Sequence, residues 1–566
     1  MDKDILEITD LKDMLNKTRK LYGNKIGYKI KIEKGKYKLY THNEIRDMID
    51  YLGTALISLG LKNKKIAVIG ENRYEWELAY LSVVCGTGIV VPLDRSLPAN
   101  ELEEVIERSE VEAIFYSKKY EEIIKKIKYS DKNKLKHLIS MDSCTHDEGI
   151  YSERELIEKG KELVEAGNRE FIDSKINPEE MKIMLFTSGT TSKSKVVALS
   201  HKNLVSNLMD LASVLDVDSS DRILSFLPLH HVYECTVGML LSLYIGAERA
   251  FCDGIRHIVE NLNEYKTTCV AFVPAIYEMF YKNIKRTLEK EGKTEETKKL
   301  MKKYKDKSMQ EKKEAFKDIH NIFGGNIKLF ISGAAALDTE VIESFRNWGI
   351  NLCQAYGLTE TSPIIGIETN ENFRTGSIGK SLPHVQAKIE DADEEGKGEL
   401  AVKGPNVMLE YYDNEEATNE VMKDGWFYTG DLARIDEDGY IFICGRKKSV
   451  IVLKNGKNIF PEEMENLVNK IEGVKESFIF GKQQSDDKED IKINVKIIFD
   501  REIMKEAYKV EKDDEIYKVL SDKIKEVNRI MPKYKGIRGI IVSETPLIKT
   551  TTNKIKRQAN LENLYI

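Results

Sequence analysis

The chain of 566 residues lacks the cysteine pattern of a disulfide framework or a zinc site. Its seven cysteines are scattered and form no CxxC pair, whereas both kinds of site need clustered spacing. Unclustered thiols are typical of proteins kept in a reducing compartment. The first residues, MDKDILEITD, also lack the apolar core of a signal peptide. These absences predict a cytoplasmic protein.

An overall excess of positive charge is also missing, because 88 basic residues face 94 acidic ones for a net charge of -6. This balance argues against a nucleic-acid partner. The longest uncharged apolar-rich run, residues 79–93, is too short to span a bilayer. One local surplus stands out, since residues 282–318 hold 14 basic and 8 acidic side chains. A solvated surface helix explains it, and weak peripheral contact with anionic lipid at the inner membrane face is the open alternative.

The hydrophobic pattern alternates between helical and strand periodicity over the first three-quarters of the chain. Residues 41–62 have apolar residues at helical spacing, with Thr41 and Glu44 as a capping box. KIAVIG at 65–70 is typical of a strand, and further strands and helices follow in turn. This order predicts an α/β fold with parallel sheets. A β-rich part begins near residue 376, and a smaller α+β unit follows Arg446. We therefore predict a large domain at 1–447 and a small mobile domain at 448–566.

The most informative segment is MLFTSGTTSKSKVVALSHKNL at 184–204. An apolar strand leads into a run of small and hydroxylated residues, which let backbone N–H groups approach phosphate oxygens closely. Lys193 and Lys195 add positive charge. The spacing of a Walker A loop is absent. Taken alone, the segment fits a phosphate-binding loop or a polar turn between strand and helix.

Three further segments carry polar groups that a nucleotide site needs. In CQAYGLTETSP at 353–363, Tyr356 could form a wall for a base, and Thr359 with Glu360 could hold phosphate and Mg²⁺. Asp431 follows a glycine, where its carboxylate could accept hydrogen bonds from a sugar. Arg446 opens a basic cluster, and LIKTTTNKIKRQ at 547–558 is a lysine-rich loop. Each segment alone also fits ordinary core or solvated surface.

In this order and spacing, the four segments resemble the superfamily of adenylate-forming enzymes, from about Thr41 to Arg557. LPLHHVYE at 227–234, IGENRYEW at 69–76 and VPLDRSLPANELEEVIERSE at 91–110 are most similar to long-chain fatty acid CoA ligases. The resemblance implies ATP-dependent activation of a fatty acid to acyl-AMP, with release of pyrophosphate. Transfer of the acyl group to the thiol of coenzyme A would follow, with Mg²⁺ as the metal.

The resemblance also implies roles for individual residues. Lys448 matches the hinge, Gly456 the loop lining the coenzyme A tunnel, and Glu360 the Mg²⁺ ligand. The implied catalytic residues are Lys554, Glu360, His231 and Thr187. The implied ATP-binding residues are Thr187, Ser188, Gly189, Thr190, Thr191, Lys195, Gly333, Ala334, Ala355, Tyr356, Gly357, Thr359, Asp431 and Arg446.

Small side chains at Gly333, Ala334, Ala335 and Ala336 stand where the family's acyl pocket begins, and we expect them to leave room for a long tail. Val232, Tyr233, Ile276, Met279 and Phe280 are candidate apolar lining, or equally plain core.

The chain departs from the family pattern at Ser192, Ser194 and Val196 in the phosphate loop and at Asn553 before Lys554. Three alternatives follow. An enzyme that loads an acyl carrier protein would share the chemistry up to acyl-AMP. An amino-acid-activating domain is disfavoured, because no FDxS pattern follows His231. A non-catalytic nucleotide-binding regulator would fit the altered loop, but Lys554 and Glu360 are both present. Chain length of the acid and the acceptor thiol stay open.

Overall fold

The computed structural model describes residues 5–130, 132–142, 149–187, 194–453, 457–483, 491–550 and 554–564. These residues divide into two compact units. The first comprises the described parts of Met1–Thr187, Lys195–Ala387 and Val402–Phe427, and the second those of Ser188–Ser194, Lys388–Ala401 and Tyr428–Ile566. The predicted domain boundary at 447/448 stays a prediction.

One sheet of the first unit has nine strands among the described residues, and it carries the candidate residues of the adenine side. Its inner strands run parallel, as the alternation of helices and strands predicted. Its strands, in spatial order, are β16 (Lys380–Ser381), β15 (Ile364–Ile367), β14 (Leu352–Gly357), β13 (Leu329–Ser332), β12 (Cys269–Phe272), β10 (Arg222–Ser225), β11 (Glu248–Phe251), β1 (Ile26–Glu33) and β2 (Lys36–Thr41).

A second sheet of this unit has eight strands within the described ranges, and it carries the candidate phosphate loop between β8 and β9. Parallel pairing of β3 with both β4 and β5 confirms the predicted strand at 65–70. In spatial order the strands are β19 (Glu410–Tyr411), β9 (Val196–Ser200), β8 (Met181–Phe186), β4 (Ile89–Pro92), β3 (Lys65–Ile69), β5 (Ala113–Tyr116), β6 (His137–Ser140) and β7 (Ile150–Ser152).

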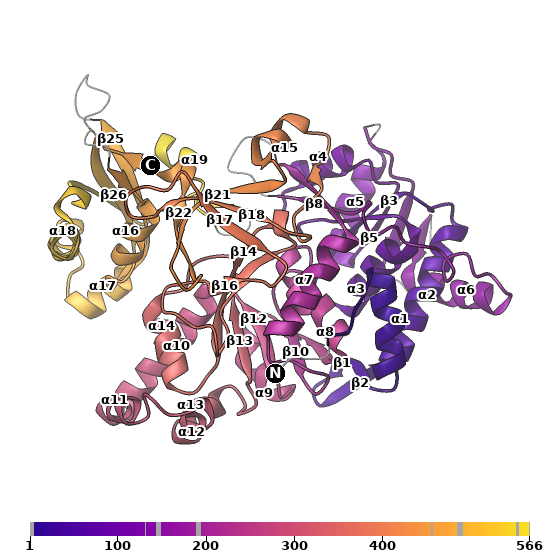
Figure 1. Ribbon diagram of the computed structural model, residues 1–566, viewed down its shortest axis with the longest axis horizontal. Coiled ribbons are helices and arrows are strands. Elements are labelled where there is room, and N and C mark those ends of the chain that lie inside the picture. Colours follow the sequence, from indigo (N-terminus) through magenta and orange to yellow (C-terminus); the bar gives the residue numbers. More distant parts are fainter. Residues whose placement is uncertain are drawn as a thin grey trace. The chain divides into compact units, whose positions relative to one another are not determined.

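Helices cover these sheets, and α1, α3 and α6 each pack against α2 (Figure 1). The predicted capping box is present, since Thr41 and Glu44 bond reciprocally at the start of α2. The α-helices of the first unit are α1 (Leu11–Tyr22), α2 (His42–Ser58), α3 (Tyr74–Ser82), α4 (Ala99–Ser109), α5 (Glu121–Lys128), α6 (Glu153–Glu165), α7 (His201–Val214), α8 (Leu241–Ile245), α9 (Ile258–Glu264), α10 (Pro274–Lys290), α11 (Thr294–Lys303), α12 (Met309–Ala315), α13 (Lys317–Ile322), α14 (Thr339–Asn347) and α15 (Glu415–Val421).

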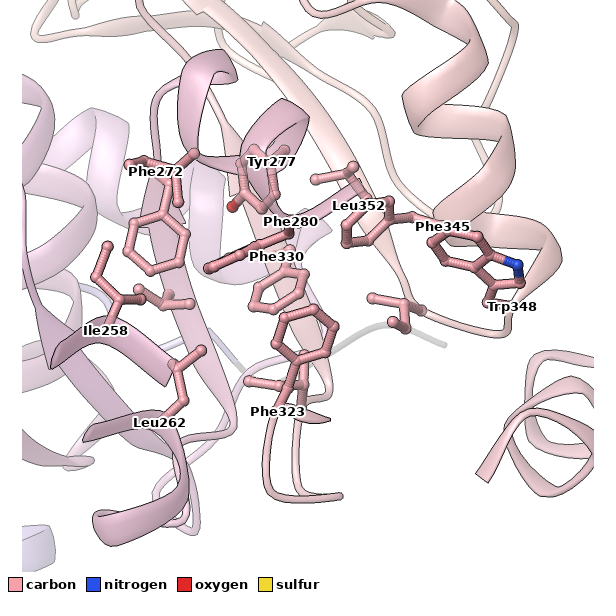
Figure 2. Close-up of a cluster of buried hydrophobic side chains, with 14 of the residues drawn as sticks. Ile258, Leu262, Phe272, Tyr277, Phe280, Phe323, Phe330, Phe345, Trp348 and Leu352 are labelled. Atoms are coloured by element: carbon pink, nitrogen blue, oxygen red, sulfur yellow. The ribbon is translucent and has the colours of Figure 1, made fainter. Parts of the chain in front are cut away.

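An aromatic core fills the space between α10, α14 and strands β12 and β13 (Figure 2). Phe330 lies near its centre, with ring centroids 5.4 Å from Tyr277 and 5.5 Å from Phe323. Tilted and edge-on pairs of this kind add to the stabilisation from buried area. Ile276 and Phe280 belong to the same core, at 5% and 3% exposure. Of the two interpretations of these residues, the structure therefore favours core over acyl lining.

The second unit contains the predicted α+β elements. Strands β25 (Val474–Gln483), β26 (Ile491–Phe499) and β27 (Gly539–Ser543) form one sheet, with α16 (Pro461–Val468), α17 (Arg501–Tyr508), α18 (Asp513–Ile530) and α19 (Arg557–Glu562) around it. The charged helix predicted at 513–530 is confirmed. A further sheet, whose strands are not confined to the second unit, has the order β17 (Gln386–Glu390), β18 (Gly398–Lys403), β21 (Trp426–Ile435) and β20 (Met422–Lys423), with β22 (Ile441–Arg446) on β21. Short strands β23 (Ile451–Val452) and β24 (Asn458–Ile459) pair with each other.

The basic segment 282–318 forms the end of α10, then α11, α12 and the start of α13. Its partly buried apolar residues, including Leu288 and Leu300, pack against the aromatic core, while exposed lysines such as Lys298 pair with neighbouring glutamates. Contact of this face with lipid stays a prediction. Within the described ranges, no helix combines the length and apolar character needed to cross a bilayer.

The six described cysteines are free, and all but Cys252 are buried. Burial raises the pKa of the Cys85, Cys235 and Cys353 thiols to about 12. A thiol with so high a pKa stays protonated at neutral pH and is a poor nucleophile. The described cysteines are therefore structural rather than reactive.

Candidate active site

The base of the candidate phosphate loop is closed by hydrogen bonds between its two ends. The Thr187 backbone N–H and hydroxyl both donate to the Lys195 carbonyl oxygen, at 2.9 and 3.2 Å. Antiparallel pairing of β8 with β9 continues this closure. The loop residues predicted to bind ATP between these ends, Ser188, Gly189, Thr190 and Thr191, lie outside the described residues. Gly456, predicted to line the coenzyme A tunnel, also lies outside them.

The segment predicted to hold adenine and Mg²⁺ follows the end of β14. Ala355 is buried within the strand opposite Ile367, and Tyr356 follows it. A side chain at Gly357 would bring its Cβ to 1.7 Å from the Pro363 carbonyl oxygen, so the close turn requires glycine. Thr359 and Glu360 then lie on a short 3-10 turn. The sequence thus places Tyr356, Thr359 and Glu360 on one tight loop.

Glu360 and Lys195 meet through a residue that the sequence did not single out. The Tyr411 hydroxyl donates to Glu360 Oε1 at 2.8 Å, and Lys195 Nζ lies 4.4 Å from the Tyr411 ring centroid. A cation over an aromatic face is attracted by the ring. Glu360 therefore contacts the hydroxyl of this tyrosine, and Lys195 lies over its ring.

In the small-residue loop after β13, Gly333 is buried, whereas Ala334, Ala335 and Ala336 are exposed. A Cβ on Gly333 would stand 2.7 Å from the Tyr233 ring, and the Tyr233 hydroxyl donates to the Ile331 carbonyl at 3.3 Å. Ala334 has φ +73°, a left-handed conformation that costs energy for any residue with a Cβ. The Tyr233 ring therefore fills the space above Gly333, while the room expected for a long tail beside the three alanines stays a prediction.

His231 lies beside a second histidine at the loop after β10. The His230 and His231 ring centroids are 4.1 Å apart, and His230 Nε2 lies 3.2 Å from Asp94 Oδ1. His230 is buried, whereas His231 is half-buried. Of the pair, the predicted residue His231 is thus the more accessible to a ligand.

A buried ionic triad supports this histidine loop. Arg249 donates through Nε to Glu77 at 2.6 Å and through Nη2 to Glu234 at 2.8 Å, and all three side chains are at most 1% exposed. Burial raises the pKa of Glu234 to about 7 and also raises the pKa of Glu77. Asn72 connects the triad to the loop, donating to Ser225 Oγ and to the Leu227 carbonyl. The segments IGENRYEW and LPLHHVYE therefore meet in the fold.

A second buried carboxyl, Glu368, lies behind β14. It accepts the Gln354 backbone N–H at 3.0 Å, while its other oxygen is buried without a hydrogen-bond partner. Burial raises its pKa to about 8. The Gln354 side chain in turn accepts the Leu337 N–H at 2.8 Å, at the end of the Gly333 loop. Glu368 therefore supports the strand that links the two candidate loops.

The raised pKa of Glu368 predicts a pH-dependent stability. The folded state retains a proton that the unfolded chain releases near pH 4.5, so this contribution is complete below that pH and is lost as pH rises toward 8. Glu368→Gln should remove this pH-dependent loss of stability. It should raise the free energy of unfolding by roughly a few kcal/mol at pH 8, with little effect at pH 4.5. Urea unfolding at both pH values measures it. Glu371→Gln, at an exposed position, is the control, and a wild-type pH slope in Glu368→Gln would contradict the assignment.

The second unit holds the candidate ribose site. Asp431 on β21 faces Arg446 on β22, and Arg446 Nε donates to Asp431 Oδ1 at 2.8 Å. The Asp431 side chain is nearly buried, while that of Arg446 is half exposed. The predicted turn Asp436–Gly439 joins the two strands, with the Gly439 N–H donating to the Asp436 carbonyl. Lys448, the predicted hinge, lies on the 3-10 turn that follows β22.

Lys554 lies on a closed loop of the same unit. Its N–H donates to Thr550 Oγ1 at 3.1 Å, and its carbonyl accepts the Thr550 N–H at 2.8 Å. Asn560 holds Ile548 through two hydrogen bonds. Its side-chain oxygen accepts the Ile548 N–H, and its side-chain nitrogen donates to the Ile548 carbonyl. The Lys554 residue itself is exposed. Hydrogen bonds with Thr550 thus fix the backbone of the predicted catalytic lysine.

The Glu360 carboxylate is a group that could hold Mg²⁺ carried by a nucleotide. In the part of the chain that the structure describes, no three His, Cys, Asp or Glu side chains gather to hold an ion. Mg²⁺ often takes one or two carboxylates and completes its shell with phosphate oxygens and water. Glu360, with Tyr411 on one oxygen, can supply such a carboxylate.

Several residues of this site were not predicted from the sequence. Asn72 and Glu234 lie within the segments that resemble long-chain ligases, and Glu77 directly follows one of them, but the sequence assigned no role to any of the three. Arg249 and Tyr411 carry no local signal, because their partners Glu77 and Glu360 are 172 and 51 residues away. Only the folded chain identifies them.

Comparison with known proteins adds to this geometry. The model of the "AMP-binding enzyme" family matches residues 21–412, and that of the "AMP-binding enzyme C-terminal domain" matches 448–565. Long chain acyl-CoA synthetase 3 of Arabidopsis thaliana is 28% identical over 79% of this chain and 72% of its own length. A long-chain-fatty-acid–CoA ligase of Salmonella typhimurium is 25% identical over 77% of each chain.

Among solved structures, ATP-bound MatB from Rhodopseudomonas palustris has the same fold, with a TM-score of 0.75 and 22% identity over 98% of this chain and 99% of that one. The family matches extend over most of the chain and include the phosphate loop, the 353–363 segment and Lys554, whereas Asp431 and Arg446 lie between the two matched ranges. The chain therefore belongs to the adenylate-forming superfamily of AMP-binding enzymes and resembles its long-chain fatty acid CoA ligases.

Proposed function

We propose that this enzyme activates a long-chain fatty acid with ATP to acyl-AMP, releases pyrophosphate, and transfers the acyl group to the thiol of coenzyme A. The observation that carries the proposal is the network of the first unit. Hydrogen bonds and ring contacts there connect the base of the phosphate loop, the Tyr356–Glu360 loop and the Gly333 loop to their supporting residues. The similarity to long-chain acyl-CoA synthetases supports the choice of acid.

The chemistry explains why these groups are needed. A carboxylate is a poor electrophile, and its attack on the α-phosphate brings two anions together. Lys554 would offset this repulsion in the transition state, and much of the remaining gain would come from positioning. Mg²⁺, when bound with the nucleotide at Glu360, supplies Lewis-acid stabilisation of phosphate charge. Tyr356 would stack on adenine, Thr359 and the loop from Thr187 would bind phosphate, and Asp431 with Arg446 would hold the ribose.

Thioester formation needs the thiol to reach the same carbonyl carbon. A lysine that occupies this space during adenylation has to withdraw, so we assign to Lys448 the hinge about which residues 448–566 turn. Gly456 would line the path of the pantetheine arm. His231 would flank the carboxylate of the acid, held by the loop that the triad of Arg249, Glu77 and Glu234 supports.

The aliphatic tail needs an apolar path beside the histidine loop. A closed apolar region of the first unit borders His230, and its side chains would have to move apart to admit a tail, because the space between them is too small for water. It is lined mainly by apolar side chains. They include Tyr80, Leu185, Leu199, Leu229, Val232 and Cys235. We assign the start of the acyl path to this region rather than to Ile276 and Phe280, which belong to the aromatic core.

Activity against acids of increasing length tests the proposal. Each buried methylene contributes about 0.8 kcal/mol, so kcat/KM should rise by at most about tenfold for each two carbons from four to about twelve. Pyrophosphate release with saturated acids measures this. Parallel reactions with coenzyme A and with acyl carrier protein identify the acceptor. A flat profile, or a maximum at acetate or benzoate, would contradict the fatty acid assignment and leave the adenylation chemistry.

A further inference from the structure

The Tyr411 side chain contacts both the candidate metal carboxylate, Glu360, and the candidate phosphate lysine, Lys195. Its hydroxyl donates to Glu360 Oε1 at 2.8 Å, and its ring faces the Lys195 ammonium at 4.4 Å. The tyrosine is 5% exposed. A buried ring with both ends engaged has little freedom to change rotamer.

The backbone around Tyr411 is fixed to the same two segments. Tyr411 is paired with Val197 in the β19–β9 ladder, two residues after Lys195. The Tyr412 N–H donates to the Val196 carbonyl at 2.8 Å, and the Met408 N–H donates to the Glu360 carbonyl at 2.8 Å. The strand that carries Tyr411 is thus attached both to the end of the phosphate loop and to the Glu360 turn.

We propose that Tyr411 is a positioning residue for the triphosphate end of ATP, which orients the Glu360 carboxylate and the Lys195 ammonium before the nucleotide binds. This proposal rests on the proposed function. The hydroxyl donates a hydrogen bond to one carboxylate oxygen of Glu360, and this bond fixes the orientation of the other oxygen. Long side chains lose rotamer freedom when they bind a ligand, and prior ordering reduces this cost.

The arrangement also places a positive charge near the negative charge of Glu360. Glu360 by itself would repel a triphosphate, whereas a lysine held over the adjacent ring partly offsets its charge. Because the hydroxyl and the ring act on different groups, Tyr411→Phe removes only the hold on Glu360. Tyr411→Leu removes both contacts.

The neighbouring tyrosine provides a matched control. Tyr412 has a ring 4.7 Å from the Lys65 ammonium and a hydroxyl 3.0 Å from the same nitrogen. It therefore offers the same kinds of contact on the next residue, directed to Lys65 instead of Glu360 and Lys195. Tyr412→Phe removes a comparable hydroxyl contact without touching the proposed site.

The test compares binding of Mg·ATP and of AMP to the full chain by isothermal titration calorimetry. Tyr411→Phe should raise the Kd for Mg·ATP about tenfold, as expected for loss of a hydrogen bond to a charged group, and leave the Kd for AMP unchanged, because AMP lacks the β- and γ-phosphates. Tyr411→Leu should weaken Mg·ATP further. The Mg²⁺ concentration for half-maximal pyrophosphate release should rise in both variants. Tyr412→Phe should behave as wild type.

Three results would overturn the role of Tyr411: unchanged Mg·ATP binding in Tyr411→Phe, equal weakening of Mg·ATP and AMP, or the same loss in Tyr412→Phe. The proposed function fails separately. If the wild type binds Mg·ATP but none of the acids makes it release pyrophosphate, the enzymatic proposal is wrong. The comparison of the tyrosine variants still decides the role of Tyr411 in that case.

Discussion

Replacing Lys554 with alanine should slow acyl-AMP formation by about 10²- to 10³-fold, the usual effect of removing one electrostatic group from a transition state. Lys554 is exposed on a loop that Thr550 and Asn560 hold closed, so the substitution should not disturb the fold. Thioester formation from preformed acyl-AMP should continue, because the proposed role of the lysine is confined to the first half-reaction. Pyrophosphate release and acyl transfer, measured separately, test both statements.

Lys556 is the matched control for this experiment. It lies two residues further along the same loop and carries the same charge, so Lys556→Ala should retain most of the adenylation rate. Equal loss of both half-reactions in Lys554→Ala would count against a role specific to adenylation. An equal loss in both variants would assign the effect to the loop's overall charge.

The second large effect concerns stability. Arg249→Met keeps much of the side-chain volume but leaves Glu77 and Glu234 buried without their cation, and should lower the free energy of unfolding by about 3–5 kcal/mol. Both carboxyl groups then have to stay protonated in the fold, so the loss should grow as pH rises. Chemical denaturation at pH 5 and pH 8 measures the loss in the free energy of unfolding and shows whether it grows with pH.

Two comparisons separate lost pairing from lost packing. Lys36→Ala breaks an exposed pair with Glu33, at 72% and 65% exposure, and should change stability by less than about 1 kcal/mol. The triple variant Arg249→Met, Glu77→Leu, Glu234→Leu removes all three charges and should recover most of the loss. A triple variant no more stable than Arg249→Met alone would show that packing, rather than unpaired charge, is the cause.

Local patterns predicted much of the fold. The capping box at Thr41 and Glu44, the helix at 513–530 and the strand at 65–69 all depend on neighbouring residues, and each is confirmed. The parallel sheets followed from alternation of helices and strands. These features could be read because the residues that determine them lie within a few positions of one another.

The site could be predicted only in part, since its supporting contacts join distant segments. The Tyr233 ring against Gly333, for example, comes from a segment 100 residues earlier and could not be read from the glycine itself. Tyr411 resembles any strand tyrosine in the sequence, and its meaning comes from Glu360 and Lys195. Arg249 is likewise ordinary until β11 brings it beside α3. Such contacts depend on which strands become neighbours in the folded chain.

The burial of the thiols has a practical meaning for following the molecule in solution. A thiol-specific reagent reacts with the thiolate form and needs access to sulfur, and five of the six described cysteines offer neither in the folded state. Cys235 and Cys269 lie in the first unit, near the histidine loop and in β12, while Cys444 lies in β22 of the second. Modification of each would therefore report a local opening of its own region, so that the order of labelling would rank the parts of the chain by how readily they open.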